Sequence, residues 1–168
     1  MAEKVLEKIG GTSGHGTFEV VDTDGVVGIR LNGEAAAVGQ LVESTVLVGA
    51  AVALTTATAA NVTSISLTAG DWDVWGNVWF NPTTTANITI HQGAINTTTA
   101  ALPTAPGAGA IFKNMLVAGQ VPNVIFGGPV GMIRLSLAAT TTVFLVAQAT
   151  FTIAALGAYG YIGARRRA

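Results

Sequence analysis

The chain has 168 residues and a mass of 17.0 kDa, which is enough for one main domain with a hydrophobic core. Charged residues make up 10% of it, against roughly 25% in typical soluble domains. Cysteine is absent, which excludes disulfides and thiolate chemistry, and a net charge of −1 favours no nucleic-acid partner. The composition therefore predicts a chain that lies in a membrane or buries much of its surface against copies of itself.

Charge is unevenly distributed along the chain. Residues 1–43 contain seven acidic and three basic residues, whereas residues 44–168 contain two acidic and five basic ones. Such an asymmetry indicates two structural units. We therefore expect an N-terminal attachment arm over residues 1–45 and a separate β-domain over residues 46–168.

The arm begins with a short segment, residues 2–9, that is either two turns of helix or extended chain. A glycine-rich linker follows at residues 10–16. Residues 17–21 and 26–31 flank an Asp-Thr-Asp-Gly turn and predict a β-hairpin. The two aspartates resemble the start of a calcium loop, but the glutamate that completes such a loop is missing at the required spacing.

The rest of the chain predicts short strands separated by turns, with residues 34–49 open between helix and strand. Turns are expected at 68–70 and 127–129, and a long loop over 97–110. The expected strands are 46–56, 61–67, 71–80, 86–96, 111–117, 132–137, 142–153 and 153–164. Eight to ten short strands with such turns are typical of an all-β sandwich.

Alternation within the strands separates a core face from an outer face. In residues 142–153, Val143 and Leu145 begin one apolar face, yet the opposite face also carries apolar residues where water would favour charges. In residues 71–80, two tryptophans share the outer face with an asparagine, as in the core of a protein interface. The residues expected at an interface with further copies of the chain are Phe144, Val146, Gln148, Trp75, Trp79, Tyr159 and Tyr161.

Candidate catalytic groups are few. His15 and His91 are the two histidines, one in the glycine linker and one in a strand, so a shared metal site is disfavoured. Asp71 and Asp73 alternate on one strand face and could form a carboxylate pair, but a structural role is favoured, with Asp73 paired to an arginine such as Arg134. No enzyme activity, metal or cofactor is expected.

The C-terminal stretch offers a membrane alternative. Residues 143–164 are uncharged, carry two tyrosines near one end and are followed by three arginines. Strand alternation and glycines at 157, 160 and 163 oppose a spanning helix, and we expect no signal sequence among the N-terminal residues. We therefore expect no membrane partner, and we expect Arg165, Arg166 and Arg167 to form a solvated basic tail.

Four segments resemble a family of small structural proteins of tailed bacteriophages and prophages. They are ISLTAGDWDVWGNVWF (65–80), GAINTTTAALPT (93–104), RLSLAATTTVFLVAQATF (134–151) and AYGYIGARR (158–166). They occur in the same order and cover roughly residues 50–167, and none of them is a functional-site motif. Residues 1–43 lie outside this resemblance.

The resemblance implies a trimeric jelly roll similar to the tumour-necrosis-factor fold. It implies a capsid decoration protein on the phage head, made in the host cytoplasm, whose partners are two further copies and the major capsid protein. A head- or tail-fibre module that binds a host glycan through Trp75 and Trp79 is the alternative. The residues expected to attach the arm to the capsid are Lys4, Val5, Leu6, Lys8, Ile9, Phe18 and Arg30.

Overall fold

The computed structural model describes residues 18–23, 26–31, 39–82, 86–105, 107–115, 120–121, 124–152 and 155–167. Its strands are β1 (Phe18–Thr23), β2 (Val26–Leu31), β3 (Leu41–Val46), β4 (Val52–Ala53), β5 (Ala60–Leu67), β6 (Gly70–Pro82), β7 (Ala86–Asn96), β8 (Ala110–Met115), β9 (Gln120–Val121), β10 (Phe126–Leu137), β11 (Thr141–Thr152) and β12 (Leu156–Arg166). One short 3₁₀ turn, η1, spans Val48–Ala50.

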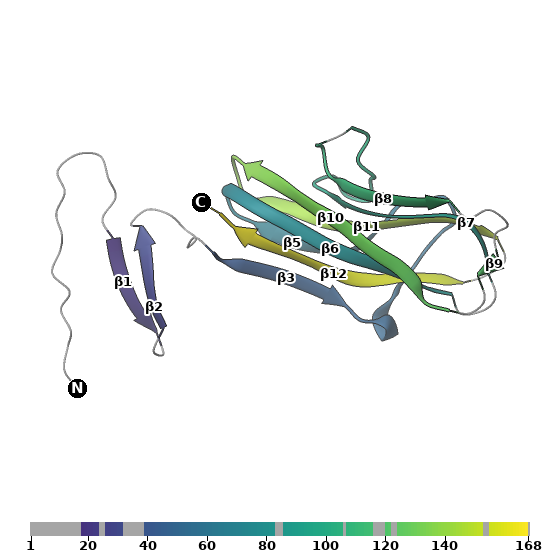
Figure 1. Cartoon of the computed structure of the whole chain (residues 1–168), viewed down its shortest axis with the longest axis horizontal. Helices are drawn as coiled ribbons and strands as arrows, with labels where there is room; N and C mark the ends of the chain where they lie inside the picture. The colour runs from purple at the N-terminus through teal and green to yellow at the C-terminus, as the bar shows by residue number, and fades with distance from the viewer. Residues whose placement is uncertain are drawn as a thin grey trace.

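Two five-stranded antiparallel sheets form the body of the protein. One has the order β10-β6-β12-β3, with β4 also paired to β12. The other has the order β5-β11-β7-β8, with β9 also paired to β7. Figure 1 shows the sheets as two layers, with β10, β6, β12 and β3 nearer the viewer.

The eight long strands of the body alternate between the sheets in the order of a jelly roll. The chain places β3 in the first sheet, β5 in the second, β6 in the first, β7 and β8 in the second, then β10, β11 and β12 in alternate sheets. This is the double Greek-key connectivity that defines the jelly roll. The predicted all-β jelly-roll sandwich is confirmed.

The core lies between the sheets and is built by strand alternation. In β6 the buried positions include Trp72, Val74, Val78 and Phe80, and in β11 they include Val143, Leu145, Ala147 and Ala149. Side chains two residues apart in a strand point to the same side, so these sets meet across the sandwich. The inward faces predicted for both strands are confirmed.

The prediction of a turn at residues 127–129 is wrong, because this glycine-rich segment is the first part of β10. Gly127 and Gly128 pair with Trp79 and Val78, and the register shifts between Pro129 and Gly131. A Cβ on Gly127 would clash with the carbonyl oxygen of Val78, so glycine permits the close strand approach. Proline is tolerated here because β10 is an edge strand and needs no donor on its open side.

The N-terminal hairpin expected over 17–31 is present, as β1 and β2 form a separate two-stranded antiparallel sheet. The open stretch 34–49 supplies β3, which begins at Leu41 and pairs with β12. Residues 2–9 lie outside the described residues, and the division into an arm and a body stays a prediction.

The C-terminal arginines are not a uniformly solvated tail. Strand β12 continues to Arg166, whose side chain is 6% exposed, lies 5.9 Å from the Trp72 ring centroid and donates to Thr68 Oγ1 at 3.2 Å. Alternation along β12 explains this, because Arg166 shares the inward parity of Ile162 and Ala164. Arg165 and Arg167 are exposed, as predicted.

Candidate functional site

A band of aromatic residues lies on the outer side of the first sheet. Trp75 and Trp79 project from β6, and Tyr159 and Tyr161 project from the neighbouring strand β12. Trp79 is the direct register partner of Tyr159, and Asn77 is that of Tyr161. These five residues are called the aromatic face below. The sequence predicted all four aromatic residues as contact residues, and the fold brings them together.

The ring of Tyr161 lies against Gly163, which has no side chain to displace it. A Cβ on Gly163 would lie 2.9 Å from Tyr161 Cζ and 3.1 Å from Trp75 Cε2, so the ring needs the space that glycine leaves. The Tyr161 hydroxyl donates to Glu43 Oε1 of β3 at 2.5 Å. Partial burial and then the Glu43 carboxylate raise the pKa of Tyr161 above its usual value.

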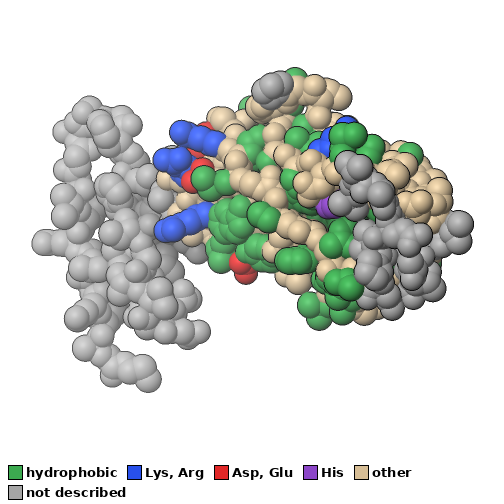
Figure 2. Space-filling model, turned by 45° about the vertical axis from the view of Figure 1, so that its right-hand side comes forward, with side chains coloured by type: hydrophobic (Ala, Val, Ile, Leu, Met, Phe, Trp, Pro, Cys, Tyr) green, Lys and Arg blue, Asp and Glu red, His purple; other side chains and the backbone are tan. Residues whose placement is uncertain are grey.

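Exposed apolar residues extend the aromatic face to both edges of the sheet. On β10, Met132 is 70% exposed and is the register partner of Trp75. On the opposite side, Leu41 at the start of β3 is 54% exposed and Leu47 just after β3 is 71% exposed. Figure 2 shows hydrophobic side chains across the middle of this body and charged side chains gathered toward one end. Along β3 the outer positions between these two leucines are Glu43 and Thr45, and Leu41 is the register partner of Arg165, so the apolar surface is interrupted at that edge.

The charged end of the same sheet is organised as ion pairs. Arg134 Nη2 lies 2.6 Å from Asp71 Oδ2, and Arg167 Nη1 lies 3.5 Å from Asp73 Oδ1. The hydrogen bond from Arg134, followed by that from Ser136, holds the pKa of Asp71 below its usual value. The sequence predicted that Asp73 pairs with an arginine such as Arg134, and in the structure that arginine is Arg167. Arg134 is the register partner of Asp73, but its guanidinium donates a hydrogen bond to Asp71, two residues earlier in β6.

Val146 is not a contact residue in this fold. It lies on the opposite sheet, paired with Asn61 of β5 and Ala94 of β7, and its side chain is 0% exposed. The prediction assumed that the outward side of β11 is open. The structure shows that the protein's own chain already buries this position.

The segment that follows β7 is held against this outer side by two asparagines. Asn61 donates from Nδ2 to Thr99 Oγ1 at 2.7 Å and accepts from the backbone N of Ala100 at 2.7 Å. Asn96 donates to the carbonyl oxygen of Ala101 at 2.9 Å and accepts from the backbone N of Thr98 at 3.2 Å. The loop of the predicted 97–110 segment is thus anchored next to Val146.

Phe144 and Gln148 are partly buried on the same outer side of β11. Gln148 Nε2 donates to the carbonyl oxygen of Ala57 at 2.9 Å, and its Oε1 accepts a hydrogen bond from Gln92. Its amide is therefore satisfied within one chain. The residues predicted as one trimer interface divide between two opposite sides of the sandwich.

His91, which the sequence places in a strand, lies in the core between the sheets. It is 5% exposed, its Nε2 accepts from Asn114 Nδ2 at 3.1 Å, and its ring packs edge-on against Phe80, Phe112 and Phe126. Burial lowers its pKa below 6.5. The inward parity that His91 shares with Gly93 and Ile95 is the signal that could have revealed this position.

The residues expected to grip a capsid cannot be placed as a group. Phe18 begins β1 and is the backbone register partner of Leu31, and Arg30 of β2 is the register partner of Glu19. The other predicted attachment residues lie outside the described residues: Lys4, Val5, Leu6, Lys8 and Ile9. Among the described residues, no group of three or more His, Cys, Asp or Glu side chains could hold a metal ion, and no helix is long and apolar enough to cross a membrane.

No protein-family model matches the sequence, and no curated protein matches it. Among solved structures, that of infectious bursal disease virus strain Gx matches with 9% identity and a TM-score of 0.45, covering 89% of this chain and 36% of that one. The subviral particle of VP2 from the same virus matches with 11% identity and a TM-score of 0.41, covering 94% and 41%. The chain thus spans about two fifths of these viral chains. Likeness at this level is one of shape.

Proposed function

We propose that this protein is a structural component of a tailed-bacteriophage virion, a homotrimeric decoration protein that binds the major capsid lattice and stabilises the head. The observation that carries the proposal is the aromatic outer face of a jelly-roll sandwich in a chain with little charge. Large continuous apolar patches are rare on monomers and mark surfaces that bind proteins. The sequence resemblance to phage structural proteins supports the same assignment.

In this proposal the sandwich forms the trimer, and residues 1–45 attach it to the capsid. A decoration protein stabilises a shell by bridging neighbouring capsid subunits. This role depends on contact area and requires no catalytic step. The net charge of the arm is negative while that of the body is positive, which separates the two surfaces electrostatically. The mature protein would lie on the outer surface of the head.

The proposal is tested by measuring the mass of the purified protein by light scattering and then its binding to undecorated shells. We expect a particle of three times 17.0 kDa that binds shells and raises their melting temperature. Removal of residues 1–38, which keeps β3 and the rest of the sandwich, should abolish shell binding without changing the oligomer. A monomer, or a trimer that ignores shells, would contradict the proposal.

A second candidate function is favoured by the exposure of Trp79. This indole is 38% exposed and lies beside Tyr159 and Asn77, an arrangement in which an aromatic ring can stack on a sugar and an amide can bind its hydroxyls. A fibre module that recognises a host glycan would use these residues. Specific binding on a glycan array that Trp79→Ala abolishes would favour this function over decoration.

A further inference from the structure

Resting on the proposed function, we infer that the trimer forms through one side of the sandwich only, the outer side of the β10-β6-β12-β3 sheet, and that its occupant is a second copy of this chain. The centre of the contact is the aromatic face. Its rims are Met132 on β10 and Leu47 just after β3.

The first argument is that the opposite side of the sandwich is already partly covered. Asn61 and Asn96 hold residues 97–101 there, and Val146 beneath is fully buried. The outward amide of Gln148 is also satisfied within the chain. A partner on that side would meet polar groups and backbone that have their hydrogen bonds already.

The second argument concerns charge and symmetry. In a symmetric contact between identical chains, residues near the axis face their own copies, so a charged residue there would face a like charge. The strip formed by Trp75, Asn77, Trp79 and Tyr159 contains no ionisable acid or base apart from the phenol. Glu43 of β3 accepts from Tyr161, and Asp73, two residues before Trp75 on the same face, pairs with Arg167. Arg134 pairs with Asp71 at the same end of the sheet.

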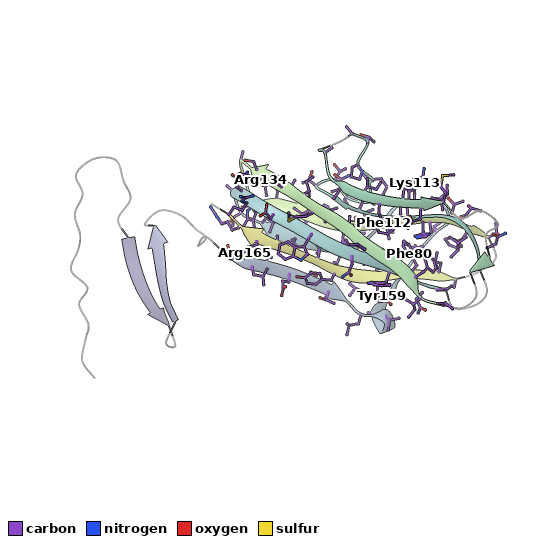
Figure 3. All side chains as sticks on the ribbon, in the orientation of Figure 1. Phe80, Phe112, Lys113, Arg134, Tyr159 and Arg165 are labelled. Atoms are coloured by element: carbon purple, nitrogen blue, oxygen red, sulfur yellow. The ribbon has the colours of Figure 1, made fainter. Side chains whose placement is uncertain are left out.

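Figure 3 shows this separation along a single strand, since Tyr159 and Arg165 lie toward opposite ends of β12. Identical copies can therefore approach each other at the aromatic end without opposing like charges. Binding to a partner of different sequence would not require the centre of the face to be uncharged. The pattern favours self-association over binding to an unrelated protein.

The third argument is size. Four neighbouring strands span roughly 19 Å, and the eleven residues of β12 span about 36 Å. The face therefore offers on the order of 700 Å² per copy, close to the ~800 Å² per partner of a standard stable interface. This area includes the charged end around Arg165 and Asp73, so the aromatic end supplies the central part of the contact and not all of it.

The test uses two methionines that are matched in exposure but lie on different sheets. Met132 is 70% exposed beside the aromatic face, and Met115 is 71% exposed on β8 of the other sheet. Because both side chains are exposed, Met132→Glu and Met115→Glu should both fold, which circular dichroism and thermal melting would verify. Mass is measured by light scattering over a dilution series, with Trp79→Glu as a second variant of the face.

We expect Met132→Glu and Trp79→Glu to raise the dissociation constant of the trimer about 100-fold or more, because a carboxylate would be desolvated in the contact. Met115→Glu should leave it unchanged. Trimers that persist in both face variants, or that dissociate in Met115→Glu, would overturn this assignment while leaving the proposed function intact. A monomeric wild-type protein would overturn both, and a monomer whose glycan binding needs Trp79 would replace them with the fibre function.

Discussion

His91 is a buried titratable group whose surroundings are aromatic. Phe80, Phe112 and Phe126 surround its ring, and Asn114 is its hydrogen-bond donor. The described neighbours that face the ring are Phe80 on β6, Phe112 and Asn114 on β8, Phe126 on β10 and Ala149 on β11. None of these side chains carries a charge. Protonation would place a cation in this site without a counter-ion.

Stability should therefore fall in mild acid. The folded pKa of His91 is lowered below its unfolded value of 6.5, so the unfolded chain binds the extra proton first as the pH falls. We expect the free energy of unfolding to decrease by up to about 1.4 kcal/mol per pH unit below pH 6.5. Urea unfolding from pH 8 to pH 5.5 measures this slope.

His91→Gln should flatten the pH dependence between pH 7 and pH 5.5, whatever its effect on stability at pH 8. An unchanged slope in His91→Gln would show that the ring is not the titrating group.

Gly163 permits the position of Tyr161 and can be tested directly. Gly163→Ala places a methyl group against the Tyr161 ring and Trp75, and the ring must move away from Glu43. Overpacking of this kind costs roughly 1–3 kcal/mol, so the melting temperature should fall. Gly128→Ala is the matched control, because a Cβ there meets nothing within 4 Å. Equal effects of the two substitutions would contradict the close fit around Tyr161.

At the scale of elements, the loop after β7 determines which outer side of the sandwich is open. Its contacts to Asn61 and Asn96 are four hydrogen bonds, of which the two to Asn61 join parts of the chain that are distant in sequence and the two to Asn96 are local. Each hydrogen bond contributes about 1 kcal/mol net to stability, so these bonds together fix the position of the loop.

Asn61→Ala should release one side of this loop. We expect amide hydrogen exchange of residues 97–101 to accelerate about tenfold or more, with a loss of global stability near 1–2 kcal/mol. Asn87→Ala, an exposed asparagine on β7, should change neither quantity. Unchanged protection of the loop in Asn61→Ala would mean that these two hydrogen bonds do not hold it.

At the scale of the whole molecule, the low charge content and the aromatic face have one explanation. Half of the residues are hydrophobic, and the two sheets bury one set of them between the layers. A second set remains on the outer side of one sheet. Burial of that set in an oligomer would remove it from water.

A contact of this kind should respond weakly to salt. Because its centre is uncharged, raising NaCl from 0.05 to 1 M should change the dissociation constant of the oligomer less than threefold. Sodium sulfate should strengthen association, since it favours apolar burial. Analytical ultracentrifugation across the two salt series measures both effects. Dissociation by 1 M NaCl would instead indicate an interface held by ion pairs.

Several features of this protein follow from local sequence alone. The alternation in β6, β11 and β12 predicts the core residues, the outward tryptophans and the outward tyrosines, because the period of two is a property of each strand by itself. The low charge content predicts a second buried surface, because composition also requires no knowledge of the fold. The sandwich class follows from the number of short strands and their turns.

Other features were decided by tertiary structure. Which sheet each outward face belongs to depends on pairing between strands far apart in the chain, such as Trp79 with Tyr159. Val146 is buried although it lies on the outer side of β11, beside Asn61 and the loop that Asn61 holds. The choice of Asp71 by Arg134 depends on side-chain reach across two strands. Local pattern states that a residue points outward. Whether that outside is solvent, a loop or a partner is determined by how the sheets fold over one another.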